Sequence, residues 1–234
     1  MGRTTLSTAL VLALLAGTAA AFAVTERLKL QPSPLGVADF THVFSPVCDC
    51  PSATAQLSLR LRKPDRLTVE LLDADGDTVR TLATDENVPA GRLVLQWDGR
   101  DAEGRLVPEG VYDPRVRLAD ARRTIRLPTP IRVDVTPPRL RLLSARPRTL
   151  QRRGDYRRRR LVVAYRLGER ALPSLYVDGV ERVRGKFRRG EGHLDWWGRV
   201  DGKHVDPGRY RLTLVALDAA GNRSRDRSFD VRVR

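Results

Sequence analysis

Short runs of alternating apolar and polar residues constrain the fold of this chain most strongly. The runs at residues 57–62, 67–71 and 93–97 place Leu, Val or Trp at every second position, with mostly polar residues between them. Successive side chains of a strand point to opposite faces, so this period of two predicts strands with one buried face. Turn residues such as Asp75-Gly76 separate the runs. Outside the N-terminus no long stretch has the period of a helix, and we expect an all-β fold.

One order of residues occurs twice in the chain. In the first copy Trp97 is followed by Pro108-Glu109-Gly110-Val111-Tyr112, and in the second copy Trp196-Trp197 is followed by Asp206-Pro207-Gly208-Arg209-Tyr210. The two tyrosines are 98 positions apart (210 minus 112), which is about the length of one seven-stranded immunoglobulin-like sandwich. The sequence therefore predicts two tandem immunoglobulin-like β-sandwich domains.

We place the two predicted domains at residues 43–136 and 139–234. A linker at residues 30–42 precedes the first domain, and Pro137-Pro138 forms a short, stiff link between the two. The repeated aromatic residues face inward and supply core area, since each large aromatic side chain buries about 150–250 Å². We therefore interpret residues 96–112 as core and turns, without a catalytic role.

The N-terminal residues 1–29 have the composition of an export segment. Arg3 supplies a positive charge, and no charged residue occurs from Leu6 to Val24. This apolar stretch is close to the roughly 20 residues that a spanning helix needs, whereas the small residues Ala19–Ala21 suit a signal peptidase. Two interpretations stay open: a single-pass membrane anchor with extracytoplasmic domains, and a cleaved signal peptide of a secreted protein.

The sequence resembles a known type of bacterial domain. The stretch Trp97–Tyr112, preceded by Val79–Leu82, resembles the Ig-like domain of the flagellar hook-capping protein FlgD, which also occurs in exported bacterial proteins. Phe44-Ser45-Pro46 is similar to the start of such domains, and Asp218–Asn222 to the last hairpin of bacterial Ig-like modules. The resemblance covers about residues 43–234 and implies tandem FlgD-type Ig-like domains. It implies little about function, because such modules occur in many settings.

The excess positive charge lies in the second predicted domain. The residues up to Pro138 contain 17 basic and 17 acidic side chains, whereas the residues after it contain 26 and 11. A basic domain attracts polyanions such as nucleic acids or acidic wall polymers. We expect a polyanion-binding surface at Arg152, Arg153, Arg157, Arg158, Arg159, Arg160, Arg188 and Arg189. The alternative is a solvated sheet edge, with a hairpin tip at Gly154-Asp155, that discourages strand pairing between molecules.

Cys48-Asp49-Cys50 is the most unusual local feature of the sequence. Thiols outside the cytoplasm are usually oxidised, which favours a disulfide between Cys48 and Cys50 that tightens the first loop. Free or intermolecular thiols stay open as an alternative. Metal binding would need further ligands, and His42 is the nearby candidate.

Motifs that carry catalysis are absent from the sequence. We find no nucleophile elbow, phosphate loop, zinc helix motif or paired-carboxylate segment, and we expect no enzyme activity and no cofactor. Asp73–Asp77 lacks the glycine and glutamate positions of an EF-hand loop. His193 and Asp195 lack an evident third ligand, so we expect no metal site.

These observations predict a non-catalytic, exported, membrane-anchored tandem Ig-like protein with a structural or adhesive role at the bacterial cell envelope. The expected partners are acidic wall polymers or an envelope protein, and nucleic acid is not favoured. Two alternatives stay open. One is a module that binds a polyanion, either extracellular DNA or an acidic wall polymer, through the basic second domain. The other is a domain that assists a separately encoded enzyme.

Overall fold

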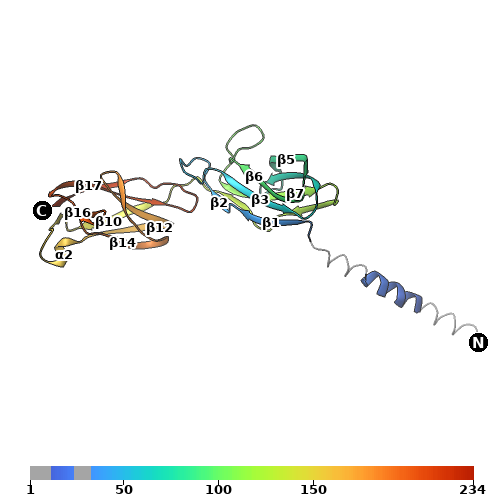
Figure 1. Cartoon of the computed structure of the whole chain (residues 1–234), viewed down its shortest axis with the longest axis horizontal. Coiled ribbons are helices and arrows are strands. Elements are labelled where there is room, and N and C mark those ends of the chain that lie inside the picture. The colour runs from blue at the N-terminus through green and yellow to red at the C-terminus, as the bar shows by residue number, and fades with distance from the viewer. Residues whose placement is uncertain (1–11, 24–32) are drawn as a thin grey trace, which may run out of the picture.

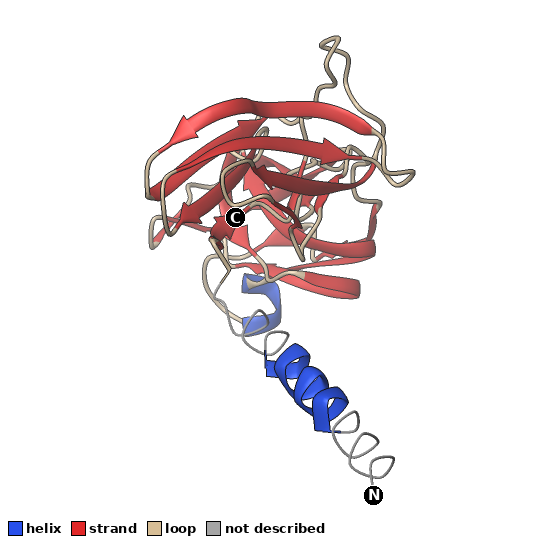
Figure 2. Ribbon diagram, turned by 90° about the vertical axis from the view of Figure 1, so that its right-hand side faces the viewer, coloured by secondary structure: helices blue, strands red, loops and turns tan. Residues whose placement is uncertain are grey.

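The structure is a computed structural model that describes residues 12–23 and 33–234, without the side chains of residues 37 and 38 (Figure 1). Residues 12–23 form a helix, and strands dominate the rest (Figure 2). No helix in the described ranges has both the length and the apolar composition needed to cross a membrane. Residues 1–11 and 24–29 of the predicted export segment lie outside the described residues.

The first strand set spans residues 35–133 and forms two sheets. Its strands are β1 Leu35–Phe40, β2 Val43–Phe44, β3 Ala55–Leu61, β4 Asp65–Leu72, β5 Thr78–Val88, β6 Gly91–Trp97, β7 Gly110–Leu118, β8 Arg123–Arg126 and β9 Ile131–Val133. One sheet has the order β1-β3-β6 and the other the order β2-β9-β7-β4-β5, with β8 paired to β7. Strand β1 lies within the predicted linker at residues 30–42, where it pairs antiparallel with β3.

The second strand set spans residues 140–233. Its elements are β10 Leu140–Arg146, β11 Thr149–Leu150, the one-turn helix α2 Tyr156–Arg159, β12 Leu161–Val177, β13 Val180–Arg184, β14 Arg188–Trp196, β15 Arg199–Val200, β16 Lys203–His204, β17 Gly208–Leu217 and β18 Arg227–Val233. Strand β12 pairs with β10 and β14 along its first part and with β13 and β17 along its second part.

The two strand sets have the same pairing order. The first part of β12 takes the place of β3 and its second part that of β4, while β10, β14, β17 and β18 take the places of β1, β6, β7 and β9. The same short parallel pair occurs in both, as β2 with β9 and as β11 with β18. Pro64 has no N–H for a strand ladder and separates β3 from β4, whereas the second set has no proline at that point and its strand continues.

The alternating residues fill two separate hydrophobic cores, as their period predicts. Leu57, Leu59 and Leu67 are fully buried in the first core, and Leu161 and Val163 in the second. The predicted all-β architecture, with the sandwich form of an Ig-like fold, is therefore confirmed. The division into domains at Pro137-Pro138 stays a prediction.

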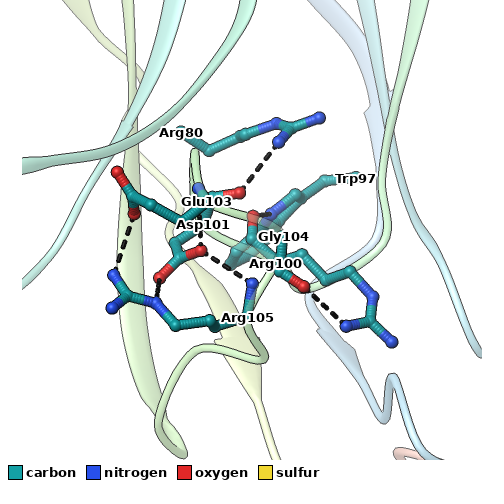
Figure 3. A network of polar contacts seen from close by, with 7 residues as sticks. All are labelled: Arg80, Trp97, Arg100, Asp101, Glu103, Gly104 and Arg105. Carbon is teal, nitrogen blue, oxygen red and sulfur yellow. Dashed lines mark hydrogen bonds and ion pairs between the residues drawn. The ribbon is translucent and has the colours of Figure 1, made fainter.

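Residues 98–105 form a closed turn after strand β6 (Figure 3). Asp101 Oδ1 accepts hydrogen bonds from the backbone N–H groups of Glu103 and Arg105, and Arg105 Nε donates to Asp101 Oδ2 at 2.9 Å. Arg80 donates to the Asp101 carbonyl at 2.8 Å, which ties this turn to β5. The indole N–H of the buried Trp97 donates to the Arg100 carbonyl at 2.9 Å. The polar groups of this turn thus hydrogen-bond to one another and to the neighbouring strands, and they stabilise the turn.

Candidate functional site

The structure brings six of the eight predicted arginines together at one end of the second strand set. They lie in the segment 152–160, which joins β11 to β12 and contains α2. Arg188 and Arg189 begin β14, whose other end, Trp196, pairs with Leu161. Because a strand advances about 3.3 Å per residue, the two ends of β14 lie roughly 25 Å apart. Arg188 and Arg189 therefore lie apart from the other six, and a single polyanion-binding surface that includes all eight stays a prediction.

The segment at Gly154-Asp155 is not the hairpin tip that its turn residues predict. Asp155 caps helix α2, with its Oδ1 atom accepting a hydrogen bond from the Arg157 N–H at 2.9 Å. The Gln151 N–H donates to the Arg158 carbonyl at 2.8 Å and closes the loop. A short polar side chain before the first helical turn explains the difference, because it satisfies N–H groups that the turn leaves free.

Helix α2 places an aromatic ring beside the end of β14. Tyr156 and Trp197 meet edge to face, with their ring centroids 4.9 Å apart. The Arg160 guanidinium lies 5.4 Å from the Tyr156 ring centroid and 5.7 Å from the Trp197 ring centroid. Arg160 Nη1 also donates to Asp195 Oδ2 at 3.0 Å. Both rings remain accessible, since Tyr156 is 51% and Trp197 is 36% exposed.

A pocket of about 510 Å³ opens beside this cluster, and we call it the Trp197 pocket. It combines two partly exposed aromatic rings with three arginines and one carboxylate. These residues are Tyr156, Arg159, Arg182, Asp195, Trp197 and Arg199, and Val183, Trp196 and His204 complete the lining. Its volume lies within the range of roughly 300–1,000 Å³ that is typical of small-molecule sites.

The Trp197 pocket also collects polar atoms that lack a hydrogen-bond partner. The described part of the chain has four such buried side-chain atoms, and three of them are Arg159 Nε, Arg182 Nε and Asp195 Oδ1. An unpaired buried polar group costs about 1–3 kcal/mol, so native proteins carry few of them and usually for a reason. The Trp197 pocket is therefore lined by two arginines and one aspartate that each have one side-chain atom without a hydrogen-bond partner.

Trp197 and Arg182 are site residues that could not be recognised from the sequence alone. The repeat predicts both Trp196 and Trp197 in the core, but Trp196 is 2% exposed, whereas its neighbour Trp197 is accessible. The available signal was position along the strand, because consecutive residues of a strand face opposite sides. Arg182 lies on β13, and only the pairing of β13 with β12 brings it to the pocket.

Cys48 and Cys50 are joined by a disulfide. The bridge lies against the turn between β17 and β18, since a Cβ atom built on Gly221 would be 2.5 Å from Cys50 Sγ and 3.4 Å from Cys48 Sγ. Next to it, Asn222 Nδ2 donates to the Asp134 carbonyl at 2.8 Å. The first loop of one strand set thus contacts the last hairpin of the other. No group of three or more possible metal ligands occurs among the residues that the structure describes.

Carboxylates gather at the same junction between the strand sets. Burial, with the charge of Asp218 adding to it, raises the pKa of Asp134 and of Glu169 above the usual carboxyl range. Glu109 accepts hydrogen bonds from the Val135 N–H at 3.3 Å and from Thr136 Oγ1 at 2.7 Å, and so holds the start of the link. At least one of these carboxylates, Glu109, therefore has a structural role at the junction, because it fixes the backbone at Val135 and Thr136.

Comparison with known proteins supports the resemblance seen in the sequence. Residues 52–121 match the family model of the FlgD Ig-like domain, which confirms the predicted FlgD-type domain in this part of the chain. Over 63 residues, 26% of this chain, the sequence is 36% identical to the basal-body rod modification protein FlgD of Salmonella typhimurium, and equally to that of Salmonella typhi. The chain spans 27% of the length of these relatives.

Solved structures that align with this chain include two bacterial proteins. The fibronectin(III)-like modules of Clostridium thermocellum CbhA align with a TM-score of 0.47 and 16% identity, over 86% of this chain and 94% of that one. FlgD from P. aeruginosa aligns with a TM-score of 0.30 and 21% identity, over 48% of this chain and 74% of that one.

Proposed function

We propose that this chain is a non-catalytic structural protein of the bacterial cell envelope whose second strand set binds acidic polymers. The observation that carries the proposal is the placement of charge. The residues up to Pro138 are balanced, whereas those after it hold the whole excess of 15 positive charges. Arg152, Arg153, Arg157 and Arg158 are exposed at the end of the second set. The FlgD-type domain at residues 52–121 serves as the spacer in this proposal.

The proposal includes export through residues 1–29, with these residues kept as a membrane anchor. It rests on the uncharged stretch from Leu6 to Val24. The test is fractionation of the native host, followed by mass spectrometry of the N-terminus. An intact N-terminus in the membrane fraction supports the anchor. A mature start near Phe22 or Val24 in the medium replaces the anchor with secretion, and a cytoplasmic pool overturns export.

Binding of acidic polymers is tested by retention on an acidic polysaccharide and on DNA at several salt concentrations. Retention by an arginine surface falls steeply with salt, since each neutralised B-DNA phosphate adds about 0.9 to the logarithmic slope. The test variant carries four Arg→Gln substitutions, at Arg152, Arg153, Arg157 and Arg158. The control variant carries the same four changes at the exposed residues Arg62, Arg122, Arg123 and Arg126 of the first set.

The proposal expects the test variant to lose retention and the control variant to keep it. An equal loss of retention in both variants would mean that binding depends on the net charge of the whole chain and not on a particular surface of the second strand set. Retention that does not respond to salt would overturn polymer binding and leave a spacer that contacts other proteins.

A flagellar role is the second candidate, and the match of residues 52–121 to the FlgD Ig-like domain favours it. Its relatives are named as basal-body rod modification proteins. Co-purification of the native chain with hook and basal-body particles, together with loss of motility on deletion of its gene, would support this role. A normally motile deletion strain would remove it.

A further inference from the structure

We propose that the Trp197 pocket binds one acidic sugar residue, with a ring carboxylate and neighbouring hydroxyl groups, of the acidic polymer that the second strand set holds. This inference rests on the proposed function and names the unit that is recognised. It follows from three features of the pocket: its accessible rings, its arginine donors and its single carboxylate acceptor.

The accessible rings fit a flat ligand with an apolar face. Tyr156 and Trp197 are partly exposed, whereas Trp196, on the same pocket wall, is buried in the core. A pyranose ring has a face of C–H groups that packs on aromatic rings. The edge-to-face contact of the two rings, with Arg160 over both, fixes their orientation before a ligand arrives. Such preorganisation lowers the entropic cost of binding.

The arginine donors fit a carboxylate. Arg159 and Arg182 each hold a buried Nε atom without a hydrogen-bond partner, and both line the pocket. A guanidinium offers its donors in a planar fork that matches the two oxygens of a carboxylate. Arg182 uses Nη1 for Asp201 at 3.0 Å, so its position is already supported from the solvent side.

The carboxylate of Asp195 decides what else the ligand must carry. Its Oδ2 atom is held by Arg160 at 3.0 Å, while Oδ1 lacks a partner. A free carboxylate oxygen accepts hydrogen bonds only and so calls for a hydroxyl donor. A phosphate dianion offers no such donor near neutral pH, and Asp195 would repel its two charges more strongly than the single charge of a carboxylate. A sugar that bears one carboxylate and several hydroxyls satisfies both kinds of lining group.

Single-stranded nucleic acid fits the pocket less well. Proteins that bind it stack successive bases on several aromatic side chains along a groove. Here one aromatic pair lies at one pocket, and Phe187, another exposed aromatic residue, lies just before the far end of β14. The arrangement therefore favours one ring-bearing unit over a run of bases.

The test is isothermal titration calorimetry of the full chain with glucuronate, glucose, glucose 6-phosphate and an oligothymidylate as separate probes. We expect saturable binding of glucuronate. Glucose should bind roughly tenfold more weakly, because it lacks the carboxylate and so loses one charge-assisted hydrogen bond. Glucose 6-phosphate should also bind more weakly than glucuronate, because Asp195 repels its doubly charged phosphate. Equal or tighter binding of glucose 6-phosphate or of the oligothymidylate would overturn the assignment to a carboxylate sugar.

Variants of residues that line the Trp197 pocket test whether glucuronate binds there. Trp197→Ala and, separately, Arg182→Gln should each weaken glucuronate binding by about tenfold or more. Phe187→Ala is the matched control, because it removes another exposed ring of the same strand set and should leave binding unchanged. Thermal melts of each variant show that it folds, and Trp197→Leu, which fills similar space without an aromatic ring, serves if the alanine variant does not.

The outcomes separate this inference from the proposed function. Unchanged glucuronate binding in folded Trp197 and Arg182 variants overturns the pocket, even when salt-dependent retention on polymers persists through Arg152, Arg153, Arg157 and Arg158. Loss of all salt-dependent retention together with intact glucuronate binding keeps the pocket and overturns the wider surface.

Discussion

The rings of Trp97 and Tyr112 meet edge to face in the first core, with their centroids 5.1 Å apart and their planes at 69°. Trp196 and Tyr210 make the same kind of contact in the second strand set, at 6.1 Å and 62°. Each tryptophan ends a strand of one sheet and each tyrosine lies near the start of a strand of the other. The repeated residues thus join the two sheets of each sandwich at one corner.

Loss of either tyrosine hydroxyl should weaken its strand set. Tyr112 donates to the Pro108 carbonyl and Tyr210 to the Asp206 carbonyl, both at 2.8 Å and both four residues back. Phenylalanine keeps the ring and removes this bond, so each Tyr→Phe variant should lose about 1 kcal/mol of the free energy of unfolding. Urea denaturation measures the loss. Tyr156→Phe, outside both cores, is the control, and an equal loss there would contradict the reasoning.

Gly99 should tolerate a side chain much less well than Gly104. Both have positive φ, +72° and +80°, so alanine at either costs about 1–2 kcal/mol of backbone strain. A Cβ at Gly99 would also lie 2.7 Å from Pro46 Cβ, whereas nothing lies within 4 Å at Gly104. We expect Gly99→Ala to lose about 3 kcal/mol or more and Gly104→Ala about half of that. Similar losses in urea denaturation would show that the contact with Pro46 is relieved cheaply.

Most of the fold could be predicted from the sequence because burial follows a local rule. A period of two identifies a half-buried strand without knowledge of its partners, and Leu57, Leu59 and Leu61 are all buried. The period of two did not identify strand β1, which directly follows Pro34. Its six residues form a strand through their pairing with β3, which cannot be seen in the local sequence. The continuity of β12 likewise could not be predicted. It depends on the residues of the second copy at the position where Pro64 separates β3 from β4 in the first copy.

The candidate site could be predicted only in part, because it depends on contacts between distant residues. Arg159 and Arg160 were found from a charge run, which is visible in sequence. Arg182 lies on β13, Asp195 lies on β14 and Trp197 directly follows β14, and the pairing of these strands with β12 brings the three residues to α2. A count of charges also does not show that the length of β14 separates Arg188 from the arginines at residues 152–160.

Gly221 should control the contact between the strand sets. A side chain there would displace the Cys48–Cys50 bridge, which lies 2.5 Å from the site of its Cβ. We expect Gly221→Ala to speed tryptic cleavage at Arg139, next to Pro137-Pro138, by several-fold, because local opening governs cleavage of a folded chain. Gly179→Ala is the control, since its φ is also positive at +84° and nothing lies within 4 Å. Equal cleavage rates in the two variants would show that the contact does not restrain the link.

Glu169 and Glu181 should respond to pH in opposite directions. Burial, with the nearby charge of Asp218, raises the pKa of Glu169. A raised carboxyl pKa stabilises the folded chain at low pH, and this contribution is lost as the pH rises through the folded pKa. The hydrogen bonds from Arg184 lower the pKa of Glu181, against the effect of burial. Its contribution is present near neutral pH and lost as the pH falls through the folded pKa.

Glutamine variants test this assignment through urea denaturation at pH 7 and near pH 4. At pH 7 we expect Glu169→Gln to gain a few tenths of a kcal/mol and Glu181→Gln to lose about as much, since partly exposed charges are screened by solvent. Both differences should shrink toward pH 4, where the carboxyl groups take up protons. A loss in both variants at pH 7 would show that Glu169 is stabilised at the junction as an anion, and the repulsion assigned to Asp218 would then be wrong.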